Sequence, residues 1–269
     1  MKKTILLTMT CIMLSCSGEC RKDIKEAYDA QPTDAAYAQL MTQIEQLNDG
    51  FEVTPDTRGF PFNRWVSVCG DVSGFLFITL ISGNTWAGLG VGAALSAILL
   101  PIDTSGMLVM PLEEKGGLTP GSIGAMHNRI ITNTVSHHPQ LFSLEPSIIY
   151  DLILEETLSQ YPESFDAQNP DFKSEAMRIY SEINRESVSS SFDYLKSKMP
   201  NKKTALDVIE SGCAFMMNFD QENVLHLYTD SFNEILNESL IPEAEKQLIR
   251  DAISLTEGSD ILWNFPEMN

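Results

Sequence analysis

The segment from Val72 to Ile102 contains no charged residue, although one-fifth of the whole chain is charged. As a single helix it would run about 46 Å, longer than the roughly 30 Å hydrocarbon core of a bilayer. Ser82-Gly83-Asn84, near its middle, is a turn signal. The segment is therefore predicted to form two helices, 72–81 and 85–100, each shorter than a usual membrane span.

Small residues recur along the second of these helices. Gly88, Gly92 and Ser96 lie four positions apart and so share one helix face, where a second backbone can approach closely. Each glycine inside a helix costs about 1 kcal/mol relative to alanine, so this composition requires a compensating close contact or a non-helical backbone. We expect a hairpin buried in a protein core. Insertion of 72–102 into a membrane is the alternative, although the flanking Asp71 and Asp103 provide no Lys/Arg asymmetry to set a topology.

The remainder of the chain is dominated by helical periodicity. Apolar residues recur at helical spacing in most segments, prolines and glycines separate these segments, and no strand-like alternation with hairpin turns is found. The sequence predicts an all-α fold, an irregular multi-helix bundle with the glycine-rich apolar hairpin packed in its core. Residues 51–65, with two prolines and a glycine, are predicted to form a loop. The other predicted helices cover segments 33–50, 122–138, 145–160, 169–200, 201–217, 220–240 and 242–258.

The first residues have the pattern of an export signal. Lys2 and Lys3 are followed by the uncharged, mostly apolar run Thr4–Leu14, which is too short to span a bilayer. The run ends in Leu14-Ser15-Cys16-Ser17, which resembles the lipobox of bacterial lipoproteins. The match departs from that pattern at Met13 and Leu14, where Leu and then a small residue are commoner. The resemblance implies that Cys16 is lipidated and becomes the mature N-terminus, and a plain cleaved signal peptide is the alternative.

This resemblance sets the expected organisation of the chain. Residues 1–15 would be the signal peptide, 16–33 a tether, and 34–269 a single helical domain with a glycine-rich apolar half (34–139) and an acidic helical half (140–269). The net charge of −19 argues against nucleic acid and against electrostatic docking onto anionic lipid. Membrane association would therefore depend on the lipid. We expect a location in the bacterial cell envelope. The sequence does not distinguish the inner from the outer membrane or one face of the membrane from the other.

Five cysteines occur in the chain. Cys11 would leave with the signal peptide, and Cys16 is the candidate for lipidation. Cys20, Cys69 and Cys213 remain, which is an odd number and resembles no dense disulfide framework. Buried thiols that pack as small apolar groups are expected, and the disulfide status of these three residues stays open.

Candidate chemistry is sparse and centres on His127. The stretch Gly-x-x-His127-Asn128-x-x-aliphatic, downstream of a glycine-rich apolar segment, resembles a group of uncharacterised secreted bacterial proteins, and this resemblance implies no activity. His127 and Asn128 are candidate binding residues. A histidine that donates one hydrogen bond at a helix interface is the alternative. Cys69 and His127 are also candidates for a Cys–His catalytic pair, although a carboxylate at Asp71 would oppose a thiolate.

No cofactor or metal site is expected. His137 and His138 could join His127 around a metal, but no His-x-x-x-His motif or cysteine pair completes such a site. Nucleotide-binding glycine loops, nucleophile elbows and zinc-protease motifs are also missing from the sequence. The favoured hypothesis is a lipid-anchored envelope protein that acts as a non-catalytic binding or interaction module. A membrane-active protein that inserts its 72–102 hairpin is the second hypothesis, and a Cys–His hydrolase the third.

Overall fold

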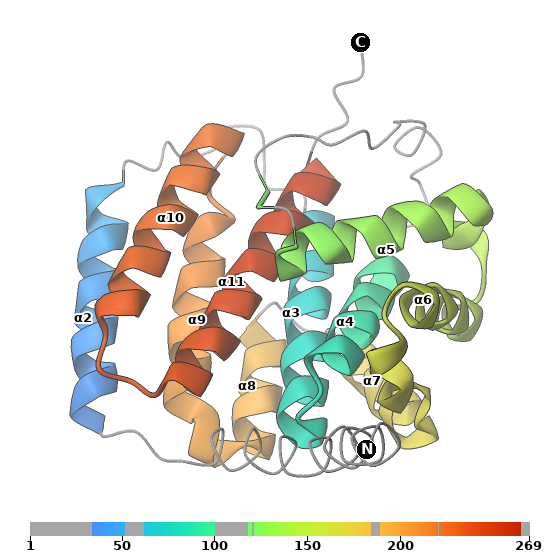
Figure 1. Cartoon of the computed structure of the whole chain (residues 1–269), viewed down its shortest axis with the longest axis horizontal. Helices are drawn as coiled ribbons and strands as arrows, with labels where there is room; N and C mark the ends of the chain where they lie inside the picture. Colours follow the sequence, from blue (N-terminus) through green and yellow to red (C-terminus); the bar gives the residue numbers. More distant parts are fainter. Residues whose placement is uncertain are drawn as a thin grey trace, which may run out of the picture.

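A computed structural model describes residues 34–51, 62–99, 118–119, 121–183, 189–219 and 221–264 (Figure 1). This part of the chain contains ten α-helices, three short 3-10 helices and no strand, which confirms the predicted all-α class. The helices are α2 (Asp34–Gly50), α3 (Phe62–Ser82), α4 (Thr85–Leu99), α5 (Ile123–His137), α6 (Pro146–Gln160), α7 (Pro170–Ile183), α8 (Ser189–Lys198), α9 (Lys203–Met216), α10 (Glu222–Glu238) and α11 (Glu243–Asn264). The 3-10 helices are η1 (Leu141–Ser143), η2 (Pro162–Gln168) and η3 (Pro200–Lys202).

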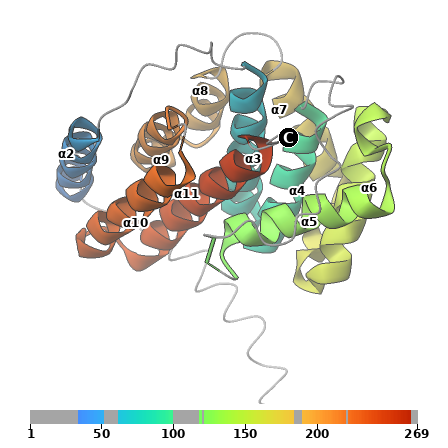
Figure 2. The ribbon, with the colours of Figure 1, turned by 90° about the horizontal axis from the view of Figure 1, so that it is seen from above.

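The α3–α4 hairpin lies in the middle of the bundle. Seen from above, it lies between a row formed by α5, α10 and α11 and a second row that contains α7 and α8, while α2 and α6 mark opposite edges (Figure 2). Contacts of α3 with α11, α7 and α8, and of α4 with α5, α6 and α7, cover the hairpin on both sides. Every residue from Ala87 to Leu99 is buried. The described part of the apolar segment, residues 72–99, therefore packs in the core of the protein, as predicted.

The turn of the hairpin is built by the three predicted residues. Gly83 has a φ of +69°, in the left-handed region that glycine adopts without strain. The side-chain oxygen of Asn84 accepts hydrogen bonds from the backbone N–H of Trp86 at 3.0 Å and of Ala87 at 3.1 Å, and so caps α4. Its side-chain nitrogen donates to the carbonyl of Glu163 at 2.8 Å, which joins the turn to η2.

Glycines let the two hairpin helices meet backbone to backbone. A Cβ at Gly88 would lie 2.6 Å from the carbonyl oxygen of Phe75, and one at Gly92 would lie 2.5 Å from that of Asp71. From the opposite helix, a Cβ at Gly74 would lie 3.0 Å from the Cα of Gly92. The separations at Gly88 and Gly92 are shorter than real Cβ contacts allow, and the separation at Gly74 is tighter than most of them. The close contact that the sequence required of its helical glycines is therefore present.

The predicted starts of two helices are wrong. Helix α3 begins at Phe62, within the segment predicted to be a loop, so the apolar segment is only the later part of this helix. The prolines and the glycine of 51–65 precede Phe62, and residues 52–61 lie outside the described part of the chain. Helix α10 begins at Glu222 with Gln221 in the capping position, whereas the sequence suggested Asp220 as its cap. Asp220 itself is not among the described residues.

Two further predictions about helix ends are also wrong. The segment 169–200 contains two helices, α7 and α8, rather than one, and residues 184–188 between them are outside the described ranges. Helix α11 does not end at Gly258 but continues to Asn264. Gly258 serves a helix crossing instead, because a Cβ there would lie 2.6 Å from the Cα of Gly124 on α5. A glycine at a crossing and a glycine at a C-cap look the same in a sequence.

Candidate functional site

Polar side chains from three helices meet inside the bundle. Asp71 on α3, His127 on α5 and Ser259 on α11 are all fully buried. The Nε2 atom of His127 lies 2.6 Å from Oδ1 of Asp71, and the Ser259 hydroxyl donates a hydrogen bond to Oδ2 of the same carboxylate. One carboxylate thus joins the apolar hairpin to two helices that follow it in the chain. We call Asp71, His127, Ser259 and their neighbour Asn128 the buried network.

Asn128 completes the buried network on the side away from Asp71. Its Oδ1 atom lies 2.9 Å from Nδ1 of His127, and its Nδ2 atom donates to the carbonyl of Gly258 at 2.9 Å. The close crossing of α5 and α11 at Gly124 and Gly258 brings these groups within reach. Both nitrogens of the imidazole therefore have hydrogen-bond partners.

The electrostatics of the buried network favour a charged imidazole. Burial alone would lower the pKa of His127, because it disfavours the charged form. The negative charge of Asp71 and the hydrogen bonds that His127 donates to Asp71 and Asn128 outweigh burial, so the pKa of His127 is raised above its ordinary value. The contact between His127 and Asp71 is fully buried, so neither side chain has water as an alternative partner.

Serine, histidine and aspartate are the residue types of a catalytic triad, but their connections here are different. In a triad the serine hydroxyl donates to the histidine, which takes its proton. Here the Ser259 hydroxyl donates to Asp71, and both ring nitrogens of His127 are engaged by other groups. None of the three side chains is accessible to a substrate. This arrangement holds helices together and activates no nucleophile.

The thiol of Cys69, the candidate nucleophile, makes no hydrogen bond to either ring nitrogen of His127. Because α3 begins at Phe62, Cys69 lies within the helix and not at its N-terminus, where a thiolate would be stabilised. Burial, together with the nearby Cys213, Glu210 and Asp71, raises the pKa of the Cys69 thiol well above its usual value. The raised pKa disfavours the thiolate, which is the nucleophilic form of cysteine.

Cys213 is a second buried free thiol. Its Sγ atom lies 2.9 Å from Oγ1 of Thr256 on α11. Burial raises the pKa of this thiol to about 12. Cys69 is likewise free, whereas Cys16 and Cys20 lie outside the described residues, as do the signal peptide and the tether.

The two histidines at the C-terminal end of α5, His137 and His138, do not belong to the buried network. His137 is exposed at the end of the helix, where its Nδ1 atom lies 3.4 Å from Oε2 of Glu156 on α6. His138 is half-buried and follows the last residue of the helix. Within the described ranges, no group of three or more His, Cys, Asp or Glu side chains is placed to hold a metal ion.

Two members of the buried network were not identified as site residues from the sequence. Asp71 was noted as the charged residue that borders the apolar segment and as a carboxylate that would oppose a thiolate, although its position in a helix so poor in charge is itself a signal of a buried partner. Ser259 lies one residue beyond the end predicted for α11, so it was assigned to no helix face. Neither residue belongs to a motif, and their contact spans 188 positions in the sequence.

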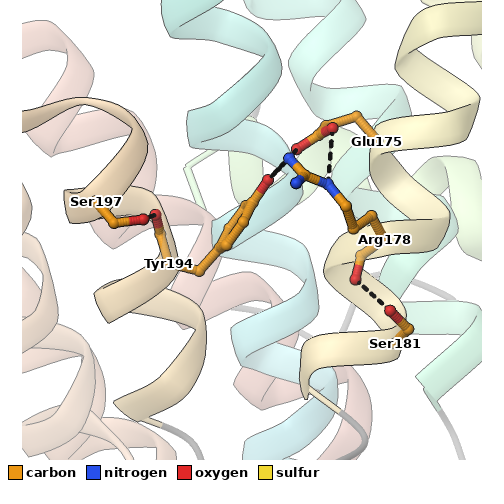
Figure 3. A network of polar contacts seen from close by, with 5 residues as sticks. All are labelled: Glu175, Arg178, Ser181, Tyr194 and Ser197. Carbon is orange, nitrogen blue, oxygen red and sulfur yellow. Dashed lines mark hydrogen bonds and ion pairs between the residues drawn. The ribbon is translucent and has the colours of Figure 1, made fainter.

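A polar network at the surface joins α7 to α8 (Figure 3). Arg178 donates from Nε to Oε2 of Glu175 at 3.1 Å, and the Tyr194 hydroxyl donates to the other carboxylate oxygen. The guanidinium carbon of Arg178 lies 4.9 Å from the centre of the Tyr194 ring, within cation–π range. Ser181 and Ser197 bond to carbonyls of their own helices. The charges of this network satisfy one another, which fits a clamp between two helices.

An open groove lies between α6 and the start of α7. It has a volume of about 670 Å³ and combines apolar with charged lining. Lys173 crosses it, with Nζ 2.6 and 2.7 Å from the two carboxylate oxygens of Asp151 and 5.6 Å from the centre of the Tyr150 ring. Unlike the buried network, this groove is accessible from solvent. The remaining lining residues are Leu154, Glu155, Leu158, Gln168 and Pro170.

Comparison of the chain with protein-family models, curated proteins and solved structures finds no match. The functional interpretation therefore depends on the geometry of the chain itself. Its two contrasting features are a network centred on the fully buried Asp71, His127 and Ser259 and an open groove with charged and apolar lining.

Proposed function

We propose that the protein is a lipid-anchored helical protein of a bacterial cell envelope that acts by binding or interaction and not by catalysis. The observation that carries the proposal is the burial of both candidate catalytic groups. Cys69 and His127 are 1% exposed or less, and the thiol has a raised pKa. A catalytic group must reach its substrate, whereas groups buried in this way contribute to stability.

The resemblance of Leu14-Ser15-Cys16-Ser17 to a lipobox supports the location. The charge of −19 supports a role for the lipid in particular, because anionic head groups would repel the polypeptide. A lipid chain supplies membrane affinity that does not depend on charge, and two or more chains give stable anchoring.

The groove between α6 and α7 is the binding surface that we favour. Its volume of about 670 Å³ falls within the range usual for ligand sites. Leu154 and Leu158 would contact apolar parts of a ligand, and Lys173 and Asp151 would orient polar parts. Lys173 would have to exchange part of its contact with Asp151 for the ligand.

The anchor is tested by Cys16→Ala in cells that produce the full chain. We expect the variant to move from the membrane fraction to the soluble fraction and to lose incorporation of labelled fatty acid. Cys20→Ala is the matched control and should change neither. A wild-type protein that carries no label and fractionates identically to the variant would reject the anchor.

Catalysis and binding are separated by complementation of a deletion strain. If Cys69 and His127 are structural, Cys69→Ala and His127→Gln should reduce function only in proportion to the amount of folded protein. Leu158→Trp, which fills the groove, should abolish function at a normal protein level, while Leu227→Trp at an exposed site on α10 should have no effect. Loss of function in Cys69→Ala or His127→Gln at full protein level would favour an enzyme.

A membrane-active protein is the second candidate, and the composition of α4 favours it. This helix is apolar around its whole circumference, a pattern shared by core helices and membrane helices. None of the described helices combines the length and hydropathy needed to cross a membrane. Dye release from liposomes distinguishes the two candidates: the binding module should leave vesicles intact, and release by the folded protein would promote the membrane-active candidate.

A further inference from the structure

The hydrogen bonds around His127 determine where its protons lie. Asn128 donates from Nδ2 to the carbonyl of Gly258, so its Oδ1 atom is an acceptor, and Nδ1 of His127 must carry a proton. On the other side, Nε2 lies 2.6 Å from Oδ1 of Asp71, while the Ser259 hydroxyl donates to Oδ2. One further proton therefore lies between Nε2 and Oδ1, and the pair as a whole is neutral.

The buried network is complete only with that one shared proton. If the proton is lost, the Nε2 lone pair faces a carboxylate oxygen, and a negative charge remains without a countercharge. If a second proton is gained, a neutral carboxylic acid faces an imidazolium, and a positive charge remains unpaired. An isolated charge in a site that excludes water is strongly destabilising, so either change favours a state in which the site opens to solvent.

We propose that the buried network is a proton-dependent latch on the apolar hairpin, closed while Asp71 and His127 share one proton and released when the pair gains or loses one. Asp71 belongs to α3, whereas His127 and Ser259 belong to α5 and α11, so the latch joins the hairpin to the surrounding helices. The latch acts independently of whether the protein binds a ligand or a membrane.

The hairpin can separate as one piece because its internal contacts involve no side chain of the latch; the contact at Gly92 is with the backbone carbonyl of Asp71. Helices α3 and α4 hold each other through the close approaches at Gly74, Gly88 and Gly92. These backbone contacts contain no titratable group. A change in the protonation of Asp71 or His127 therefore weakens the attachment of the hairpin and leaves the hairpin itself intact.

No other charge among the described residues is placed to replace either partner. Helix α4 carries no titratable side chain, and Arg129 on α5 is exposed. Cys69 on α3 is a neutral thiol, and Asp260, buried beside Ser259, is engaged in contacts of its own. The charged groups on the other packed helices pair with one another: Glu175 with Arg178, Glu210 with Lys196, Glu156 with His137, and Glu257 with His226.

Release of the hairpin can be measured through the thiol of Cys69, a residue of α3 that is buried in the closed protein. The full chain is treated with 4,4′-dithiodipyridine between pH 4 and 10, and modification of the Cys69 peptide is quantified by mass spectrometry. Each rate is divided by the rate in urea-unfolded protein at the same pH. We expect a minimum near neutral pH and a rise on both sides that approaches about tenfold per pH unit, as linkage to one proton requires. Far-UV circular dichroism should remain helical over the rise.

Asp71→Asn tests the proton count directly. An amide at this position donates from Nδ2 to Nε2 of a neutral His127 and accepts from Ser259, so the network is complete without a shared proton. The alkaline rise should disappear, and the acid rise, caused by protonation of His127, should remain. Ser259→Ala removes one hydrogen bond without changing the proton count, so it should raise the whole profile and keep both limbs. His226→Gln, a change to the paired histidine of α10, should keep both limbs unchanged.

Three outcomes would overturn the latch: protection of Cys69 that does not vary with pH, an alkaline rise that persists in Asp71→Asn, or a rise that coincides with loss of helix. If Asp71→Asn does not fold, the wild-type and Ser259→Ala profiles decide. A Cys69 modification rate that rises on both the acid and the alkaline side in both proteins, before helix is lost, supports the latch. A rise on one side only, or on neither, refutes it.

Discussion

The hairpin region and the region formed by α2, α9 and α10 pack their interiors by opposite means. In the hairpin, glycines remove side chains so that backbones touch, as where a Cβ at Gly92 would lie 2.5 Å from the carbonyl oxygen of Asp71. In the other region large rings fill the space. The Tyr228 ring centre lies 5.3 Å from those of Phe51 and Phe215 and 5.4 Å from that of Phe219.

The difference teaches what each region can tolerate. Where backbones are in contact, no neighbour can rotate away, so one added carbon must displace a helix. Where rings interlock, an added atom can be absorbed by rotation of a side chain, but a removed ring leaves a cavity that the helices cannot close. Additions should therefore damage the hairpin region most, and deletions should damage the aromatic region most.

The largest expected effect is a deletion in the aromatic region. Phe232→Ala removes a fully buried ring from α10 and should lower the free energy of unfolding by about 3–5 kcal/mol. Urea denaturation followed by circular dichroism measures the change. Leu227→Ala, at an exposed site on the same helix, should change it by less than about 0.5 kcal/mol. A loss below about 1 kcal/mol for Phe232→Ala would show that this region repacks and would end the contrast.

The next effect comes from adding a single methyl group to the hairpin. Gly92→Ala should lower the free energy of unfolding by about 1–3 kcal/mol, although alanine is the better helix former, because its Cβ meets the carbonyl of Asp71. Gly50→Ala is the matched control, since nothing lies within 4 Å of a Cβ there. It should be neutral within about 0.5 kcal/mol. Equal effects at the two glycines would contradict the role assigned to backbone contact.

A smaller effect is expected where the hairpin meets α11. Ser259→Ala leaves one oxygen of a buried carboxylate without its donor and should lower the free energy of unfolding by about 1–2 kcal/mol. Thermal melting of both proteins at the same pH measures it. Ser231→Ala, at an exposed hydroxyl that bonds only within α10, provides the comparison and should be silent. A stabilising effect of Ser259→Ala would show that the hydroxyl is not needed by Asp71.

The smallest effect concerns His226, a partly exposed histidine between Glu257 and Glu222, with Nδ1 2.7 Å from Oε1 of Glu257. Burial would lower the pKa of His226, but the two carboxylates raise it above its ordinary value. A raised pKa in the folded state adds stability that is fully present below the unfolded pKa of about 6.5 and is lost as pH rises through the folded value.

Unfolding of wild type and His226→Gln should therefore differ at pH 6 and converge at higher pH. Because His226 is partly exposed, 0.5 M salt should reduce the difference at pH 6. A difference that grows with rising pH would refute the assignment.

The fold class, the hairpin and its turn followed from local signals in the sequence. Gly83 and Asn84 form a turn signal that divides the apolar segment, and the four-residue spacing of Gly88 and Gly92 places both on one helix face. The long course of α11 did not follow, because Gly258 is a stop signal locally and becomes a helix residue only when Gly124 lies against it. Tertiary contact overrode local propensity at that position.

The buried network was only half visible in the sequence for the same reason. His127 stood out because it lies with Asn128 in the stretch Gly-x-x-His-Asn-x-x-aliphatic. Its partner Asp71 lies 56 positions away, and Ser259 is 188 positions from Asp71. No periodicity or motif connects such distances. What a sequence reports poorly is which polar residues meet when helices cross.

The separation of 188 positions between Asp71 and Ser259 also imposes an order of events on folding. The α3–α4 hairpin joins neighbours in the chain and needs only a short loop to close, so it can form early. The Asp71 carboxylate of the hairpin can pair only later, when α5 and α11, which are distant in sequence, pack against it. We expect refolding to begin with a collapsed hairpin whose Asp71 is still hydrated, and to finish with a slower step in which α11 docks and water leaves the carboxylate.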